Sequence, residues 1–188
     1  MRTTVLGLTF FAAACAVPVD NPVPVGMEMP APPPPSDYHV WLQQLVGSWT
    51  VTSEAVMGPD TEPMKMQYAA RTRSIGEFWI QTESSAKFDG QAFTSLMTLG
   101  YDPAQEAFVG TWVDSMQTHM WKYRGTLDNT GKVLTLVTEG PSFEDPNVVV
   151  EMHDIIEVKS KDHLVLTSRA QGLDGKWVEF MTANYRRK

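Results

Sequence analysis

The stretch Trp41-Leu-Gln-Gln-Leu-Val-Gly-Ser-Trp49 is followed directly by an alternating run from Thr50 to Met57. Ser36 or Asp37 can cap a short helix through the apolar positions of this stretch, and Gly47 ends it. After Trp49 the apolar period changes to two, which is the period of a strand with one buried face. A helical turn that leads through Gly-x-Trp into a strand is how a small antiparallel β-barrel begins.

The same alternation continues to the C-terminus, with no helical period between the segments. Turn signals separate them, and Asp89-Gly90 and Asp174-Gly175 are typical of tight hairpins. We expect strands over 65–74, 78–87, 93–101, 108–116, 118–127, 132–138, 148–158, 164–171 and 177–186. With the strand after Trp49 this makes about ten short, evenly spaced strands, which indicates an all-β protein. Sequential hairpins without a long crossover favour an antiparallel up-and-down barrel over residues 37–188, with the short N-terminal helix plugging one end.

The segment before the helix has the pattern of an export signal. Arg2 supplies one positive charge, and the apolar run from Val5 to Ala14 is too short to span a bilayer as a helix. We therefore interpret residues 1–14 as a signal peptide that is not part of the fold.

The single cysteine follows three alanines, and Ala12-Ala13-Ala14-Cys15 resembles the lipobox of bacterial lipoproteins, although Leu is commonest where Ala12 stands. In that interpretation Cys15 carries the lipid, and Ala16 is similar to a signal for outer-membrane sorting. The alternative is cleavage after Ala16 and secretion without a lipid. Both interpretations place the domain outside the cytoplasm, in the cell envelope or periplasm if Cys15 is lipidated.

Residues 15–36 read as a linker. More than half of the 13 prolines lie between residues 18 and 35, and such a run favours an extended polyproline II spacer. The formal net charge is −7, and basic residues cluster only at the C-terminal Arg186-Arg187-Lys188. This distribution argues against nucleic acid as a partner. We expect contact with a membrane only through Cys15, and the sequence does not indicate an oligomeric state.

Two sets of residues resemble known families. Gly47-x-Trp49 at the first strand resembles the entry motif of the calycin superfamily, which includes lipocalins and fatty-acid-binding proteins. In lipocalins a basic residue of the last strand packs over this Trp, and the resemblance implies that Arg186 or Arg187 does so here.

A wider set of runs resembles the bacterial family known as domain of unknown function 1579, which is placed among calycin-like barrels. The resemblance covers about residues 37–188 and implies a fold, but it brings no activity or catalytic residue. It rests on Leu42–Trp49, Ser95–Asp102, Phe108–Met116, Thr118–Trp121, Leu134–Pro141 and Phe180–Lys188.

His119 is the most informative titratable residue. It lies in Thr118-His-Met-Trp121 and shares strand parity with Trp121 and Tyr123, while Trp112 and Asp114 belong to the preceding strand. If that face is interior, His119 contacts a ligand or binds haem iron. The alternative is a structural histidine that is hydrogen-bonded to Asp114 or Ser95. The candidate cavity residues are Trp49, Tyr68, Trp112, His119, Trp121 and Tyr123.

Other site chemistry has little support in the sequence. No two histidines have the spacing of a zinc-binding helix, so we expect no metal site and, apart from haem at His119, no cofactor. No serine stands in a nucleophile elbow. The preferred hypothesis is therefore a barrel that binds a small, mostly apolar ligand. The alternatives are an enzyme that uses His119 with Asp114 in the same cavity, and an envelope module with a packed interior.

Overall fold

The computed structural model describes residues 30–56, 58, 61–88 and 90–188, and residues 34–188 form one compact unit. A short helix α1 (Asp37–Leu42) and a 3₁₀ turn η1 (Gln43–Leu45) precede the sheet. The ten strands are β1 (Gly47–Ala55), β2 (Met64–Ile75), β3 (Trp79–Phe88), β4 (Gln91–Asp102), β5 (Ala107–Asp114), β6 (Trp121–Leu127), β7 (Val133–Pro141), β8 (Val149–Ser160), β9 (His163–Gln171) and β10 (Trp177–Arg187).

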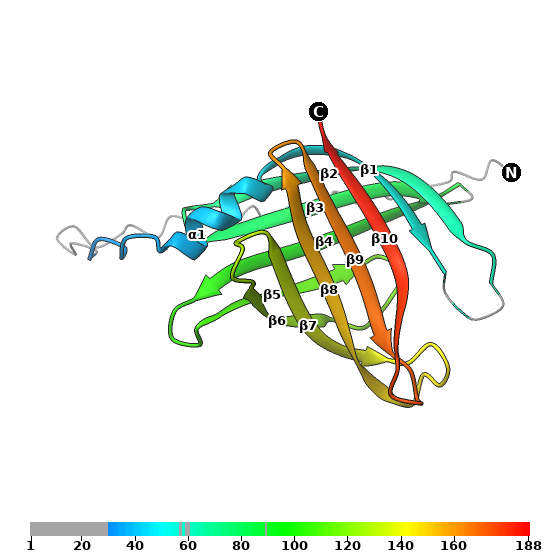
Figure 1. The fold of residues 1–188 in the computed structure, drawn as a ribbon. Helices are drawn as coiled ribbons and strands as arrows, with labels where there is room; N and C mark the ends of the chain where they lie inside the picture. Colours follow the sequence, from blue (N-terminus) through cyan, green and yellow to red (C-terminus); the bar gives the residue numbers. More distant parts are fainter. Residues whose placement is uncertain (1–29, 57, 59–60, 89) are drawn as a thin grey trace, which may run out of the picture. The chain divides into compact units, whose positions relative to one another are not determined.

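The strands form one closed antiparallel barrel (Figure 1). Each strand pairs with its neighbours in the chain, and β1 also pairs with β10, in a register that runs from Trp49 opposite Arg187 to Ala55 opposite Met181. Closure pairs the two edge strands with each other. The predicted up-and-down barrel is therefore confirmed.

Alternation along the strands separates the interior from the outer surface. In β1, Trp49, Val51, Ser53 and Ala55 are buried, and the residues between them are half-buried or exposed. The register extends this inward row around the barrel, for example from Val51 to its β2 partner Tyr68 and its β10 partner Tyr185. Strand parity thus decides which side chains line the interior.

Trp49 and Arg187 join the first strand to the last. The guanidinium carbon of Arg187 lies 4.2 Å from the centroid of the Trp49 ring, close enough for a cation–π interaction. Arg187 also donates hydrogen bonds to the carbonyl oxygens of Val46 (2.7 Å) and Gln44 (3.0 Å), and Trp49 Nε1 donates to Leu45 O at 3.1 Å. The predicted basic residue over this Trp is Arg187.

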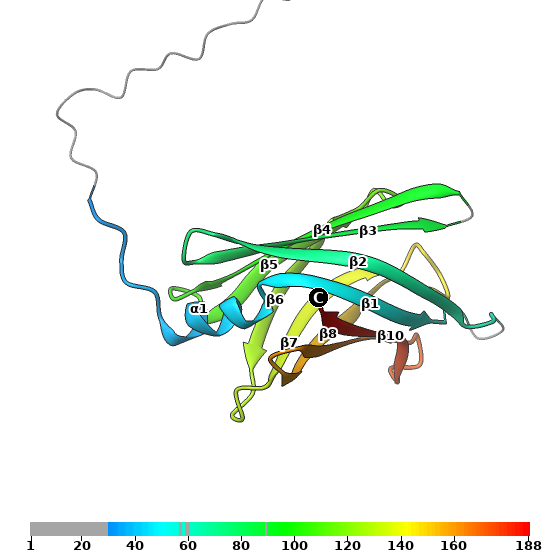
Figure 2. The same cartoon turned by 90° about the horizontal axis from the view of Figure 1, so that it is seen from above.

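Helix α1 covers the end of the barrel at which β1 begins (Figure 2). Trp41 Nε1 donates a hydrogen bond to Gly131 O at 2.7 Å in the β6–β7 turn, and His39 Nε2 donates to Tyr101 O at 3.0 Å on β4. These bonds, with the buried side chains of Leu42 and Leu45, hold the helix and its 3₁₀ turn against this end. The predicted plug is therefore present.

Candidate functional site

The barrel contains a cavity of about 710 Å³, lined by side chains from all ten strands. This volume is within the range of small-molecule sites in proteins. Leu45 and Trp49 contribute to its floor at the helix end, whereas Met116, Gln117 and Phe143 come from loops at the other end. The interior is therefore hollow.

Most of the cavity wall is apolar or aromatic. Six methionines contribute, and Met side chains adapt to ligands of irregular shape: Met64, Met66, Met97, Met116, Met152 and Met181. Seven serine and threonine residues add hydroxyl groups to the wall: Thr72, Thr82, Ser84, Ser95, Thr138, Ser142 and Ser168. Such a wall fits a ligand whose body is apolar.

The structure places five of the predicted site residues on this wall: Trp49, Tyr68, Trp112, Trp121 and Tyr123. Trp112 and Trp121 are direct cross-strand partners on β5 and β6. Trp49 is only 1% exposed, so it supports the floor more than it offers contact surface. That these residues bind a ligand stays a prediction.

His119 is not among the described residues that line the cavity. Strand β6 begins at Trp121 instead of at Thr118, and His119 therefore lies in the β5–β6 loop. Its Nε2 donates to Glu139 O at 3.2 Å, and its ring meets Trp121 edge-on, with 4.7 Å between the ring centroids.

Asp114 explains why the loop differs from the predicted pattern. Its carboxylate accepts hydrogen bonds from the backbone amides of Met116 and Gln117, which closes a turn and ends β5 two residues earlier than expected. His119 and Asp114 thus have separate partners, and neither the predicted His119–Asp114 pair nor a bond from His119 to Ser95 is formed.

Sequence reasoning missed a polar cluster around Asp154, on β8. This half-buried residue faces inward, opposite Leu136 of β7, and lines the cavity. Tyr123 Oη donates to one carboxylate oxygen at 2.5 Å, and Ser168 Oγ donates to the other. The only available signal was parity, because Asp154 shares a face with Met152 and Ile156.

Burial controls the ionisation of this cluster. It raises the pKa of the Asp154 carboxyl, and the hydrogen bonds from Ser168 and Tyr123 offset part of that increase. Burial, and then the charge of Asp154, hold the pKa of Tyr123 well above 10. Burial, and then the nearby Tyr68, also hold the pKa of Tyr185 well above 10. Both phenols are therefore neutral at physiological pH.

Two polar atoms of the wall have no hydrogen-bond partner among the residues that the structure describes, Trp121 Nε1 and Thr138 Oγ1. Thr138 is only 5% exposed, so water does not reach its hydroxyl from the outer surface. The Trp121 ring lies directly over Gly140, where a Cβ atom would come within 2.0 Å of it. Gly140 thus creates the space for this Trp on the wall.

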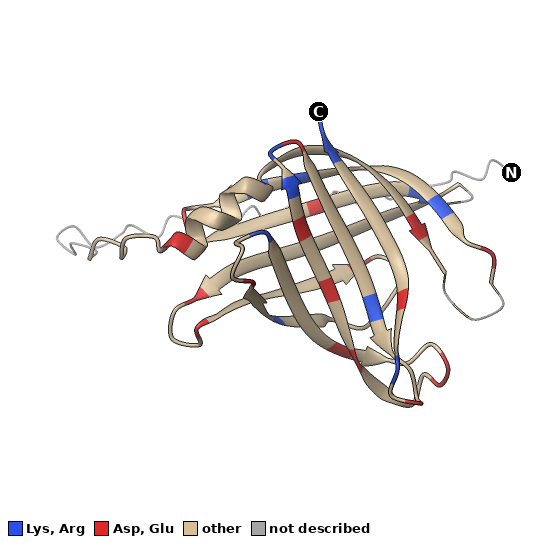
Figure 3. Ribbon diagram, in the orientation of Figure 1, with Lys and Arg blue, Asp and Glu red and all other residues tan. Residues whose placement is uncertain are grey.

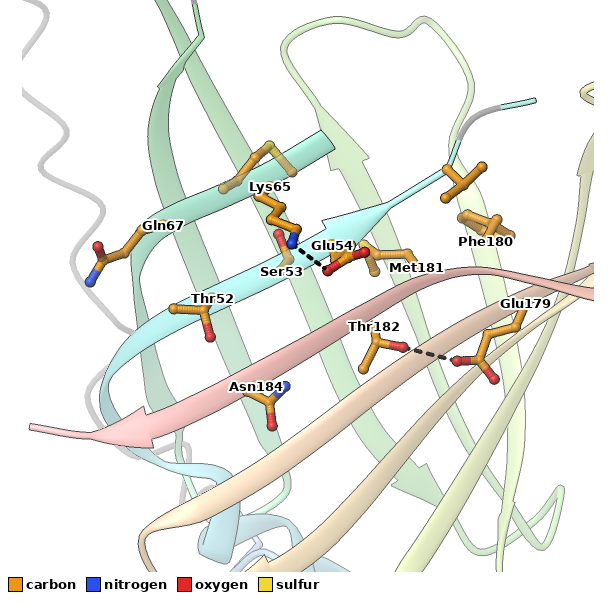
Figure 4. Close-up of a pocket in the computed structure, with 12 residues that line it drawn as sticks. Thr52, Ser53, Glu54, Lys65, Gln67, Glu179, Phe180, Met181, Thr182 and Asn184 are labelled. Atoms are coloured by element: carbon orange, nitrogen blue, oxygen red, sulfur yellow. Dashed lines mark hydrogen bonds and ion pairs between the residues drawn. The ribbon is translucent and has the colours of Figure 1, made fainter. Parts of the chain in front are cut away.

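A second concavity lies on the outer surface, over β1, β2 and β10 (Figure 4). Figure 4 shows the ion pair between Lys65 and Glu54 (3.5 Å) and the hydrogen bond from Thr182 to Glu179 (2.9 Å). Lys65 and Glu54 are largely exposed, and such pairs contribute little to stability or binding. We assign no site to this groove.

Within the described ranges, no three His, Cys, Asp or Glu side chains come together in a way that could hold a metal ion. In the same part of the chain, no helix has both the length and the apolar character needed to cross a membrane.

The fold and its interior define a closed ten-stranded β-barrel with a hollow, mostly apolar core. The profile of the family described as Protein of unknown function (DUF1579) matches residues 34–187, and the chain belongs to this family. The predicted family is thus confirmed. A search of functionally curated proteins gave no significant match.

Three solved barrel structures are similar to this chain, each at low sequence identity to it. Rv2717c from M. tuberculosis matches with a TM-score of 0.56 and 15% identity, over 81% of this chain and 98% of that one. The S-type phycobiliprotein lyase CPES from Guillardia theta matches with a TM-score of 0.55 and 12% identity, over 82% and 98%. A redesigned β-barrel matches with a TM-score of 0.44 and 12% identity, over 82% and 99%. For Rv2717c and the lyase, the likeness at these identities is one of fold.

Proposed function

We propose that the protein binds one small, mostly apolar molecule inside its barrel. The observation that carries the proposal is the cavity of about 710 Å³, whose wall is mainly aromatic, methionine and aliphatic. Removing an apolar molecule from water into such a space is favourable, by roughly 25 cal/mol for each Å² of surface buried. Haem ligation by His119 is not part of the proposal, because His119 lies off the cavity wall.

The ligand would enter at the end opposite α1. The hairpin loops β5–β6 and β7–β8 lie there, because α1 precedes β1 and the strands alternate in direction. Met116, Met120, Phe143 and Val149 are exposed at or beside these loops, and Met116 is 65% exposed. An apolar rim of this kind suits the passage of an apolar molecule.

A cavity-blocking variant tests the proposal. Ser95 is buried on β4 and lines the cavity, so Ser95→Trp should fill the space that a ligand would occupy. We expect the neutral fluorescent probe N-phenyl-1-naphthylamine to bind the wild type, and its affinity to fall at least tenfold in Ser95→Trp. Fluorescence titration of the purified protein measures both.

The matched control is Leu96→Trp, which adds the same side chain at the next position of β4, where residue 96 faces outward and is exposed. This variant should bind the probe as the wild type does. Equal probe binding by wild type and Ser95→Trp, with both proteins folded by circular dichroism, would contradict a binding role for the cavity.

We further propose that the protein is exported and anchored by a lipid on Cys15, a residue that lies outside the described part of the chain. The support is the sequence pattern of residues 1–15 and the proline-rich linker. Cys15→Ser should move the protein from the membrane fraction to the soluble fraction, and mass spectrometry should find the lipid only on the wild-type N-terminal peptide. Unchanged membrane retention in Cys15→Ser would refute the anchor.

A further inference from the structure

The charged residues on the cavity wall are all of one sign. Among the lining residues that the structure describes, the only ionisable acids or bases besides tyrosine are Asp154 and Asp114, and there is no Lys, Arg or His. Along the strands as a whole, by contrast, acidic and basic residues are interspersed (Figure 3). The described part of the cavity wall thus has acidic groups without a basic group.

Asp154 has hydrogen-bond donors but no counter-charge inside the barrel. Its interior partners, Tyr123 and Ser168, are neutral hydroxyl groups. His153, which precedes Asp154, and Arg169, which follows Ser168, occupy outward-facing positions of β8 and β9 and pair there with each other at 3.0 Å. His153 also pairs with Glu151 at 2.8 Å. Burying a carboxylate without an opposite charge is costly, and a cation bound beside it would offset that cost.

Aromatic side chains of β5, β6 and β10 line the same cavity as Asp154. Tyr123, which donates to Asp154, follows Trp121 by two residues on the inward face of β6, and Trp112 is the cross-strand partner of Trp121. Tyr185 of β10 lies near enough for the charge of Asp154 to raise its pKa. Faces of Trp and Tyr attract cations, most strongly where water is excluded. Carboxylate and aromatic rings together favour the same kind of ligand.

We propose that the occupant of the cavity is a hydrophobic cation, an apolar molecule that carries an amine or quaternary ammonium group next to Asp154. This inference rests on the proposed binding function and specifies its ligand class. The aliphatic and methionine wall would hold the apolar body, while Asp154 and the rings beside it would hold the charged group. A fatty acid or another apolar anion would meet two carboxylates and no basic partner, and it should bind poorly.

Three ligands of equal chain length separate the possibilities: decyltrimethylammonium, decanol and decanoate, each below its micellar concentration at pH 7.5. We measure how well each displaces N-phenyl-1-naphthylamine from the wild-type protein. Decyltrimethylammonium should bind at least tenfold more tightly than decanoate, with decanol between them. The quaternary ammonium is charged at every pH, so its own ionisation does not affect the result.

Asp154→Asn keeps the size of the side chain and removes its charge. This substitution should lower the affinity for decyltrimethylammonium at least tenfold and change the affinity for decanol by less than threefold. Asp114→Asn is the matched control, because Asp114 lines the cavity but already accepts two backbone amide hydrogen bonds. Asp114→Asn should lower the affinity for decyltrimethylammonium less than Asp154→Asn does. A larger loss of affinity in Asp114→Asn would overturn the assignment to Asp154.

The outcomes distinguish this inference from the binding function on which it rests. If decanoate displaces the probe as well as decyltrimethylammonium does, the barrel still binds apolar molecules, but the preference for cations is refuted. If the wild type does not bind the probe, the binding function itself fails. The ranking of the three ligands on the wild type needs no variant, so it decides the question even if Asp154→Asn does not fold.

Discussion

Replacing Trp49 with alanine should lower the free energy of unfolding by about 3–5 kcal/mol, the usual cost of removing a large buried aromatic side chain. Trp49 is 1% exposed, packs edge-on against Tyr185 and donates to Leu45 O. It also supports the guanidinium of Arg187, which binds the carbonyl oxygens that lead into β1. The substitution should therefore loosen the contact between the first strand, the last strand and the 3₁₀ turn η1.

Trp79→Ala is the control for residue type. Trp79 lies on the outer face of β3, is 39% exposed and covers Gly100 of β4. Its removal should cost about 1 kcal/mol, which is typical of a partly exposed position. Urea unfolding followed by circular dichroism measures both variants. Equal losses in the two proteins would mean that the pair of Trp49 and Arg187 does not hold the barrel closed.

The sequence predicts this fold well because alternation and turn chemistry are local signals. The two-residue period along β1 indicates which side chains are buried, and Asp174-Gly175 marks a hairpin that the structure contains. The pairing of Trp49 with Arg187 joins opposite ends of the chain, and only the family resemblance made it predictable.

The site was less predictable because it depends on contacts between distant strands. Tyr123 and Ser168, which bind Asp154, lie 31 and 14 residues away from it in the chain. Parity alone shows that Asp154 faces inward, and it cannot show which hydroxyl groups meet it. His119 was misplaced for a local reason, because the turn formed by Asp114 ends β5 early and removes His119 from the strand. Whether a barrel interior is hollow depends on the summed packing of its side chains.

Asp154→Asn should make the ligand-free protein more stable than the wild type at neutral pH, and the gain should increase with pH. Burial raises the pKa of Asp154 in the folded protein above the value of about 3.9 for an unfolded chain. The folded state therefore holds this proton more strongly than the unfolded state does. Its contribution to stability is complete below about pH 3.9 and is lost as pH rises through the folded pKa, by at most about 1.4 kcal/mol for each pH unit.

The difference in unfolding free energy between Asp154→Asn and wild type should thus increase from about pH 4 upward and become constant above the folded pKa of Asp154. Tyr123 and Tyr185 stay neutral throughout, and the nearby charge of His153 offsets only part of the increase in the pKa of Asp154.

Asp128→Asn is a control of opposite sign, and its pH-dependent effect falls below about pH 4, outside the range in which Asp154 acts. The hydroxyl of Thr130 and then the amide of Val133 lower the pKa of Asp128, so its contribution to stability is present above about pH 3.9 and is lost as pH falls through its folded pKa.

Parallel stability curves for wild type and Asp154→Asn from pH 4 to 8 would show that burying the Asp154 carboxylate has no cost. A cation would then gain nothing from pairing with it. A difference in unfolding free energy that grows with pH would instead measure the stability that the wild type loses by burying an unpaired charge. A bound cation should restore that stability to the wild type and not to Asp154→Asn.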